Sequence, residues 1–382
     1  MKNQTHLTTE QKKEIVTEEG VTIYSYGEKI TKELEVFYNP VMKINRDISL
    51  LFIKAYFTTQ NKKKIKFCDP MTASGIRELR FLKTMPEIFE KITMGDISQE
   101  AIDNIKNNFK NNNISLNGHE LAQNDAVNTI SKQYYDFIEI DPFGSPVPFV
   151  DIAIQRMKHN GILSVTATDT AALCGTYPKR TLRRYGMRVE KLLCYEEIGL
   201  RNLIAHCQVQ AAKFDKILIP QVTFSFEHFY KIFFKVQDSK SIATDNIKDL
   251  RYMEYEKSTQ KITLNKYENE NTVIGKTYVG LLQNKDQVQE MINNLDLIED
   301  KKKIEKLLNK LNDEGDEIGY FNLHRIEREN KISSNMKFVD IIEKLKQKGF
   351  NASFPHCGKL CIKTNATCED ILEVLKESLN TE

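Results

Sequence analysis

The feature that most constrains the fold is an alternation, between residues 64 and 237, of short apolar segments with longer segments of helical periodicity. The short segments have the length and composition of buried strands, and the longer ones have apolar residues every three or four positions. Strands that alternate with helices predict a parallel sheet with helices on both faces. The predicted strands are Lys64–Cys68, Ile92–Met94, Leu121–Gln123, Phe137–Ile140, Ile162–Thr168, Lys216–Phe226 and Phe229–Val236.

The last two predicted strands determine how this sheet ends. Only Glu227 and His228 separate them, which is too short for a crossover helix, so they must form an antiparallel hairpin. A parallel sheet that closes in one antiparallel strand resembles the Rossmann-like core of class I S-adenosylmethionine-dependent methyltransferases. We therefore predict an α/β fold of this class. A long helix is expected before the hairpin, from about Met187 to Lys213.

Length and local composition predict two domains. The chain has 382 residues, enough for about two domains of roughly 150 residues each. We expect a methyltransferase domain over residues 1–237, made of an N-terminal substrate-contacting segment, 1–60, and a doubly wound core, 61–237. Residues 238–270 are polar and poor in strand patterns, which predicts a linker or excursion. A smaller α+β domain is expected over residues 238–382.

Composition and charge restrict the class of protein. The chain has 55 Lys and Arg against 53 Asp and Glu, a net charge of +2, so any nucleic-acid interface must be a local patch. No apolar run approaches the length of about 18 residues that a membrane span needs, so no membrane partner is expected. Residues 1–13 lack the apolar core of a signal peptide, and a cytoplasmic location is expected.

The cysteines argue against a covalent or metal-bound framework. They are seven in number, irregularly spaced and without a Cys-x-x-Cys pair, so we predict neither disulfides nor a metal site. The nearest approach to a ligand set is His356 and Cys357 with Cys361, for which buried free thiols are the simpler interpretation.

Acidic residues follow four of the predicted parallel strands, at Asp69, Asp96, Asp125 and Asp141. Open α/β sheets bind ligands at the carboxyl ends of their strands, so these residues predict the functional site. Asp69 begins a loop of small residues that ends at Gly75, where backbone can approach a ligand. Asp96 is placed to bind both hydroxyls of a ribose. Asp125 and Ala126 could meet an adenine amino group, or Asp125 could only cap a helix.

The segment Asp141-Pro142-Phe143-Gly-Ser-Pro146 is the most informative one. The exocyclic amine of a base is a poor nucleophile because its lone pair is delocalised into the ring. The Asp141 carboxylate and the Pro142 carbonyl can each accept one N–H, which directs the lone pair outward, and the carboxylate can take the released proton. Phe143 offers a face on which an extruded base can stack. The alternative is that these residues only form a loop.

Two further groups of residues suggest binding roles that the sequence alone leaves open. Phe37 could form a second wall around a base, and Arg46 could hold the carboxylate of a methionine moiety. Arg180, Arg184 and Arg188 are spaced four residues apart. If they are helical they form one basic stripe suited to a phosphate backbone; otherwise each is an ordinary structural or solvated residue.

Several of these segments together resemble one known family, the tRNA guanine-26 dimethyltransferases of the archaeal type. The motifs that carry the resemblance occur in the family's order and extend over nearly the whole chain. In the first part they are Glu35-Val-Phe-Tyr-Asn-Pro40, Asn45-Arg-Asp47, Ala73-Ser-Gly-Ile-Arg77, Asp141-Pro-Phe-Gly-Ser-Pro146, Thr168-Asp169, Cys174-Gly175 and Arg184-Tyr-Gly186. Near the C-terminus they are Gly349-Phe350, Phe354-Pro-His356 and Ile362-Lys-Thr364.

The resemblance implies an enzyme that methylates the exocyclic amine of guanosine 26 in tRNA once or twice, with S-adenosylmethionine as cofactor. It implies that the cofactor is held by Arg46, Arg77, Asp96, Asp125 and Ala126. Asp141 would be the catalytic acceptor, and Phe37 and Phe143 would enclose the flipped guanine. The C-terminal domain and the arginine stripe would hold the tRNA, and no obligate protein partner is implied. Many members carry Cys-x-x-Cys pairs that are absent here, so zinc is not predicted.

Two alternatives remain open at this stage. The Asp-Pro-aromatic pattern also occurs in enzymes that methylate amines of DNA bases or amides of proteins. A chain of this kind could also have lost catalysis and act as a tRNA-binding chaperone, although the intact Asp96 and Asp141 argue against that.

Overall fold

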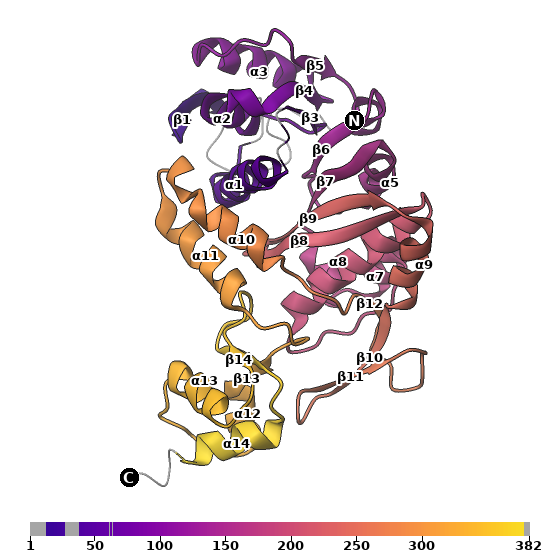
Figure 1. The fold of residues 1–382 in the computed structure, drawn as a ribbon, viewed down its shortest axis with the longest axis vertical. Coiled ribbons are helices and arrows are strands. Elements are labelled where there is room, and N and C mark those ends of the chain that lie inside the picture. The colour runs from indigo at the N-terminus through magenta and orange to yellow at the C-terminus, as the bar shows by residue number, and fades with distance from the viewer. Residues whose placement is uncertain (1–12, 27–37, 61, 63, 378–382) are drawn as a thin grey trace, which may run out of the picture. The chain divides into compact units, whose positions relative to one another are not determined.

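The computed structural model describes residues 13–26, 38–60, 62 and 64–377, and Figure 1 shows its helices and strands. The chain forms two compact units. The first consists of Met1–Gln133 with Leu297–Glu299, and the second of Tyr134–Asp296 with Asp300–Glu382. This division falls within the predicted methyltransferase domain. The boundary expected at residue 237 does not coincide with the division between the two units. That residues 1–237 form the methyltransferase domain and 238–382 the smaller domain stays a prediction.

The first unit opens with an antiparallel hairpin that the sequence analysis did not predict, formed by β1 (Lys13–Glu18) and β2 (Val21–Tyr26). Glu19 and Gly20 connect the two strands, and both have positive φ, 49° and 71°, as a type I′ turn requires. The other elements are η1 (Pro40–Met42), α1 (Lys43–Thr59), β3 (Ile65–Asp69), α2 (Ile76–Thr84), η2 (Pro86–Ile88), β4 (Phe89–Asp96), α3 (Gln99–Asn111), β5 (Glu120–Gln123) and α4 (Ala126–Ser131). Strand β4 pairs in parallel with both β3 and β5.

The second unit contains the remaining strands of the sheet and the C-terminal elements. Its first part comprises β6 (Tyr135–Ile140), α5 (Val147–Arg156), β7 (Met157–Ala167), α6 (Thr170–Leu173), α7 (Pro178–Tyr185), α8 (Tyr195–Ala212), β8 (Lys216–Phe226) and β9 (Phe229–Asp238). Then follow α9 (Lys240–Lys248), β10 (Arg251–Glu256), β11 (Lys261–Asn265), β12 (Ile274–Thr277), α10 (Lys285–Asn293), η3 (Leu295–Leu297) and α11 (Lys301–Asp313). The last elements are β13 (Phe321–Asn322), α12 (Leu323–Glu329), α13 (Phe338–Gln347), β14 (Ala352–Ser353), β15 (Cys361–Thr364) and α14 (Cys368–Glu377).

All seven strands predicted from the sequence are present, in the sheet order β5-β4-β3-β6-β7-β9-β8. Strand β7 is parallel to β6, whereas β9 is antiparallel to both β7 and β8. The predicted hairpin is therefore confirmed, and its second strand lies between β7 and β8. Helix α8 packs against β8, and α5 packs against β6 and β7. The apolar strands predicted from the sequence are buried because helices cover them.

Two expectations about local structure are wrong. The helix expected from Met187 begins at Tyr195, because α7 ends at Gly186 in the left-handed conformation (φ 69°) and an irregular segment follows. The stretch 238–270, expected to be a linker or excursion poor in strands, contains α9, β10 and β11, and β10 pairs with both β11 and β12. Only one residue of β10 and none of β11 is buried, so neither strand has the apolar pattern by which a strand is predicted.

The described part of the chain contains no helix that is both long enough and apolar enough to cross a bilayer. All seven cysteines are buried free thiols. Among the residues with described positions, no three His, Cys, Asp or Glu side chains gather as the ligands of a metal ion would.

A buried cluster of ion pairs holds the β1–β2 hairpin of the first unit against its helices. Arg46 Nε and Nη2 donate to the two oxygens of Glu18 at 2.8 and 2.5 Å. Arg80 donates from its two terminal nitrogens to Glu18 at 2.6 Å and to Asp47 at 2.5 Å. Burial alone would raise the pKa of Glu18, but the hydrogen bonds and charges of Arg46 and Arg80 lower it to about 2. This cluster joins segments 28 and 62 residues apart.

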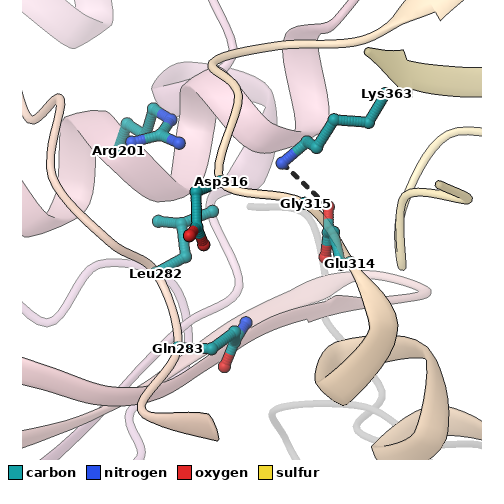
Figure 2. Close-up of a pocket in the computed structure, with 7 residues that line it drawn as sticks. All are labelled: Arg201, Leu282, Gln283, Glu314, Gly315, Asp316 and Lys363. Carbon is teal, nitrogen blue, oxygen red and sulfur yellow. Dashed lines mark ion pairs between the residues drawn. The ribbon is translucent and has the colours of Figure 1, made fainter. Parts of the chain in front are cut away.

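A second buried cluster lies in the second unit and joins α8 to elements near the C-terminus. Glu197 pairs with Arg201 at 2.7 Å and with Lys363 at 2.9 Å, and Lys363 also pairs with Glu314 at 3.0 Å. Glu314 accepts a further hydrogen bond from His356 at 2.5 Å. Figure 2 shows the small pocket beside this cluster, lined by Arg201, Leu282, Gln283, Glu314, Gly315, Asp316 and Lys363. No residue predicted to belong to the functional site lines this pocket.

Candidate functional site

The described residues of the predicted site fall into two groups, one in each unit. In the first unit, the loop between β3 and α2 is tightly folded. Asp69 accepts a hydrogen bond from the amide of Met71 at 3.0 Å, and its carbonyl accepts one from the Thr72 hydroxyl at 2.8 Å. Gly75 has φ +75°, and a Cβ there would meet Ile105 at 3.3 Å. Glycine is therefore required at Gly75 both by its backbone conformation and by the close approach of α3.

Asp96, the last residue of β4, connects this loop to the next helix. Its two carboxylate oxygens accept hydrogen bonds from the amides of Ala73 and Ser98, each at 3.0 Å. Because each carboxylate oxygen can accept two hydrogen bonds, both oxygens retain capacity for a ligand hydroxyl. The neighbouring Ile97 is 74% exposed, an apolar surface beside a fixed carboxylate. Ile97 was not predicted as a site residue, because a single apolar residue after a strand carries no distinguishing pattern.

Asp125 and Ala126 begin α4, and the structure shows the helix-capping role of Asp125. Its carboxylate accepts a hydrogen bond from the Asn128 amide at 3.0 Å. The side chain remains exposed, and the amide of Asn124 donates to the carbonyl of Asp96 at 2.9 Å. Capping and ligand binding are compatible, because the backbone bond fixes Asp125 next to the end of β4.

The two arginines predicted to hold the cofactor are both buried and already engaged. Arg46 holds Glu18, and its Nη2 also donates to the carbonyl of Asn39 at 3.3 Å. Arg77 donates to Asn45 at 3.2 Å and to Ser49 at 3.1 Å. The guanidinium of Arg77 also lies 3.5 Å from the Asp69 carboxylate. Both side chains are thus fixed in place by protein partners.

Glu78 on α2 is a buried acid close to these residues that the sequence analysis did not identify. Burial, and then the nearby charge of Asp69, raise the pKa of Glu78 well above its usual range. No sequence pattern distinguishes it from an ordinary exposed glutamate of a helix.

In the second unit, the segment after β6 forms a braced loop. The Gly144 amide donates to the Thr168 hydroxyl at 2.7 Å, and the Thr168 amide donates to the Gly144 carbonyl at 2.9 Å. Gly144 has φ +89°, a conformation that favours glycine. Asp141 is half-buried and Pro142 is buried, whereas the Phe143 side chain is 50% exposed. The loop therefore presents an aromatic ring to solvent directly beside a carboxylate.

The three predicted tRNA-binding arginines are exposed, but they do not form one helical stripe. Arg180 and Arg184 lie on α7, and Arg180 lies over the Tyr177 ring, 5.0 Å from its centroid. Arg188 follows the end of α7 and pairs with Glu190 at 2.8 Å. The helical spacing expected for Arg188 is wrong because Gly186 ends the helix. Phe37, the second predicted wall of the base site, lies outside the described residues.

Strand β9 lies antiparallel between β7 and β8, and acidic residues lie at the carboxyl ends of β3, β4, β5 and β6. These features define a class I methyltransferase. The chain belongs to the N2,N2-dimethylguanosine tRNA methyltransferase family, whose sequence model matches residues 9–376.

Individual relatives agree with this membership. The chain is 33% identical over 380 residues to a tRNA (guanine(26)-N(2))-dimethyltransferase of Methanocaldococcus jannaschii, covering 94% of this chain and 98% of that protein. A tRNA (guanine(26)-N(2)/guanine(27)-N(2))-dimethyltransferase of Aquifex aeolicus is 37% identical over 246 residues, 63% of this chain and 62% of that protein. The structure of Trm1 from Pyrococcus horikoshii in complex with S-adenosyl-L-methionine has a TM-score of 0.84 at 29% identity, covering 95% and 99% of the two chains. The predicted family, fold class, enzyme class and cofactor are therefore confirmed.

Proposed function

We propose that this chain transfers one or two methyl groups from S-adenosylmethionine to the exocyclic amine of guanosine 26 in tRNA. The family supports the reaction class, and the names of the relatives support the position. The observation that carries the proposal is the braced loop after β6, in which Asp141 and the Pro142 carbonyl stand next to the exposed ring of Phe143.

The first unit fits the cofactor in its donor and acceptor groups. Asp96 keeps hydrogen-bonding capacity for two ribose hydroxyls, and the exposed Ile97 suits the face of an adenine. Asp125 and Ala126 are assigned to the adenine amino group. Arg46 has five N–H donors, of which Glu18 and Asn39 engage three, so it retains donors for a carboxylate.

Arg77, fixed by Asn45 and Ser49, is assigned to the same cofactor site. When bound, S-adenosylmethionine supplies an electrophilic methyl group on a sulfonium.

The chemistry assigned to the second unit is the activation of an amine. Asp141 and the carbonyl of Pro142 each accept one N–H of the guanine amine, which directs its lone pair away from the loop. Asp141 then takes the proton that the amine loses. Gly144 and Thr168 hold the loop from behind, so the acceptors are fixed before the base arrives. After the first transfer one N–H remains, so in a second transfer only one of the two acceptors holds the amine, and Asp141 is the one that must take the last proton.

The remaining assignments concern the grip on tRNA. Phe143 stacks on the flipped guanine, and Phe37 is assigned to the opposite face. Arg180, Arg184 and Arg188 contact the phosphate backbone, because all three guanidinium groups are exposed. An enzyme with this substrate works in the cytoplasm, where tRNA is found.

The decisive experiment is mass spectrometry of nucleosides from unmodified tRNA incubated with the protein and S-adenosylmethionine. We expect dimethylguanosine that disappears when guanosine 26 is replaced, and a parallel replacement at position 27 tests the second site named for the Aquifex relative. Asp141→Ala should lower methyl transfer by at least about 10³-fold, since it removes the base and one acceptor, while calorimetry still detects cofactor binding.

Asp151→Ala is the matched control, because Asp151 is a half-exposed acid on α5 that pairs with Lys213 at 3.2 Å. It should leave turnover unchanged. Full turnover by the Asp141 variant would refute the role assigned to Asp141. Methyl transfer to duplex DNA or protein but not to tRNA would favour the alternative amino-methyltransferase. Tight tRNA binding without cofactor binding would favour a chaperone.

A further inference from the structure

A chain of polar contacts connects the loop after β6 to the basic helix α7. The hydroxyls of Ser145 and Tyr185 lie 3.0 Å apart, and the Tyr185 hydroxyl donates to Asp169 Oδ1 at 2.7 Å. The second oxygen of Asp169 accepts a hydrogen bond from Arg184 at 2.9 Å. Asp169 therefore links an exposed arginine of α7 to the loop that carries Asp141.

The direction of the protons in this chain is fixed by chemistry. Tyr185 has one hydroxyl proton, and it is given to Asp169, whose ionised carboxylate can only accept. The Tyr185 oxygen must therefore accept the hydroxyl proton of Ser145. Burial, and then the charge of Asp169, raise the pKa of Tyr185, so its hydroxyl stays protonated and remains a donor.

The middle of this series of polar contacts is buried, and its outer end, at Arg184, is exposed. The Asp169 side chain is 8% exposed, whereas that of Arg184 is 43% exposed. Tyr185 is buried with its ring edge-on to His206, 5.2 Å between centroids, so α8 supports it from behind. Only one Arg184 nitrogen is engaged by Asp169, so the rest of the guanidinium fork remains available for a phosphate.

We propose that Asp169 and Tyr185 are positioning residues that couple a tRNA phosphate bound by Arg184 to the placement of the Asp141 loop. This inference rests on the proposed function and adds a second role to the basic helix. Phosphate binding holds Arg184, Arg184 orients Asp169, and Asp169 with Tyr185 fixes Ser145. These contacts are already formed in the free protein, and a docked tRNA phosphate tightens them, so the loop that presents Asp141 and Pro142 is held more firmly when tRNA is bound.

The test is a double-mutant cycle on Arg184→Gln and Tyr185→Phe, with kcat and KM measured for a tRNA transcript. Tyr185→Phe keeps the ring and removes only the hydroxyl, so we expect kcat to fall about ten-fold with KM within about two-fold. Arg184→Gln should raise KM and also lower kcat. The double variant should have a kcat close to that of Tyr185→Phe alone, because both changes interrupt one chain.

The matched control is the cycle of Arg183→Gln with Tyr185→Phe. Arg183 is an exposed arginine of the same helix, and its effect should multiply with that of the tyrosine variant. Ser145→Ala should have the same kcat as Tyr185→Phe. The double variant of Ser145→Ala and Tyr185→Phe should show no further loss of kcat. If the wild type methylates tRNA but the kcat losses of Arg184→Gln and Tyr185→Phe multiply in the double variant, the coupling is overturned and the proposed function stands.

Hydrogen exchange separates failure of the coupling from failure of the proposed function. Binding of the tRNA transcript should slow exchange of the Gly144 amide about ten-fold in the wild type and not in Tyr185→Phe. A wild type that binds tRNA without methylating it would refute the proposed function, and this difference in exchange would still support the coupling. Equal protection of Gly144 in both proteins would overturn it.

Discussion

Each unit contains a buried cluster of ion pairs. The cluster of the first unit includes a residue assigned to the cofactor site, whereas the cluster of the second unit includes none. In the first unit, Arg46 and Arg80 are balanced by Glu18 and Asp47. Arg46 is also one of the residues proposed to hold the cofactor, so under that proposal the cluster would link the stability of the hairpin to cofactor binding. The same side chain serves as a structural ion-pair partner and as a proposed ligand for a carboxylate.

The cluster of the second unit contains none of the assigned site residues. Arg201 and Lys363 are balanced by Glu197 and Glu314. Burial alone would raise the pKa of Glu314, but the charge and hydrogen bond of His356, together with Lys363, lower it to about 2. This cluster holds β15 and the chain after α11 to α8, and its role is structural.

The largest expected effect comes from breaking the first cluster. Arg80→Met would leave Glu18 and Asp47 buried without one of their partners, and should lower the free energy of unfolding by about 3–5 kcal/mol. Urea denaturation at pH 7 measures this loss. Lys54→Met is the control, because Lys54 and Glu87 form an exposed pair at 3.4 Å that should contribute less than about 1 kcal/mol. Equal losses in the two variants would contradict the importance assigned to burial.

A smaller loss is expected from the second cluster, and it depends on pH. The pKa of Glu314 falls from 4.5 to about 2 on folding, so its contribution is complete above pH 4.5 and is lost as the pH falls toward 2. Glu314→Gln should lower the free energy of unfolding at pH 7 by about 2–3 kcal/mol and flatten the acid limb. Hydrogen exchange should locate the loosening at β15, whereas Arg80→Met should loosen β1 and β2. An unchanged acid limb would show that Glu314 does not carry this dependence.

The smallest expected effect is an increase in the free energy of unfolding. It concerns Glu78, a buried acid that belongs to neither cluster. Glu78 is neutral in the folded chain over a wide range, because burial and then Asp69 raise its pKa. As the pH rises above about 4.5, the unfolded chain ionises Glu78 and the folded chain does not, so stability decreases. Glu78→Gln removes this term and should raise the free energy of unfolding at pH 8 by about 1 kcal/mol. A loss of equal size at pH 4 and pH 8 would instead show that the carboxyl group is needed for packing.

Much of the fold could be predicted because buried parallel strands carry a strong sequence pattern. All of β8, from Lys216 to Phe226, was predicted to the residue. In contrast, β10 and β11 are half-exposed, so their residues do not alternate strongly enough to predict a strand. The β1–β2 hairpin has the Glu19-Gly20 turn, but β1 (Lys13–Glu18) is mostly polar, so no apolar strand pattern accompanies the turn.

The positions of the acidic residues at the strand ends could be predicted from the sequence. The contacts that their neighbouring side chains make could not. Asp69 and Asp96 end β3 and β4, and Asp125 and Asp141 follow β5 and β6, so all four lie at strand ends as expected. The engagement of Arg46 by Glu18 depends on a contact between residues 28 positions apart, which local pattern cannot reveal. The chain from Ser145 through Tyr185 and Asp169 to Arg184 likewise exists only in three dimensions.

The position of β9 between β7 and β8 has a consequence for how the chain is completed during synthesis. Strand β7 is finished at Ala167, yet its antiparallel neighbour is not finished until Asp238. Until then β7 presents an unpaired edge of an apolar strand, the kind of edge at which chains associate wrongly. Helices α6, α7 and α8 are all made in that interval, so the growing chain has apolar helix surface available before the sheet can close. A fragment that stops before Phe229 should consequently aggregate, however well strands β3 to β7 are formed.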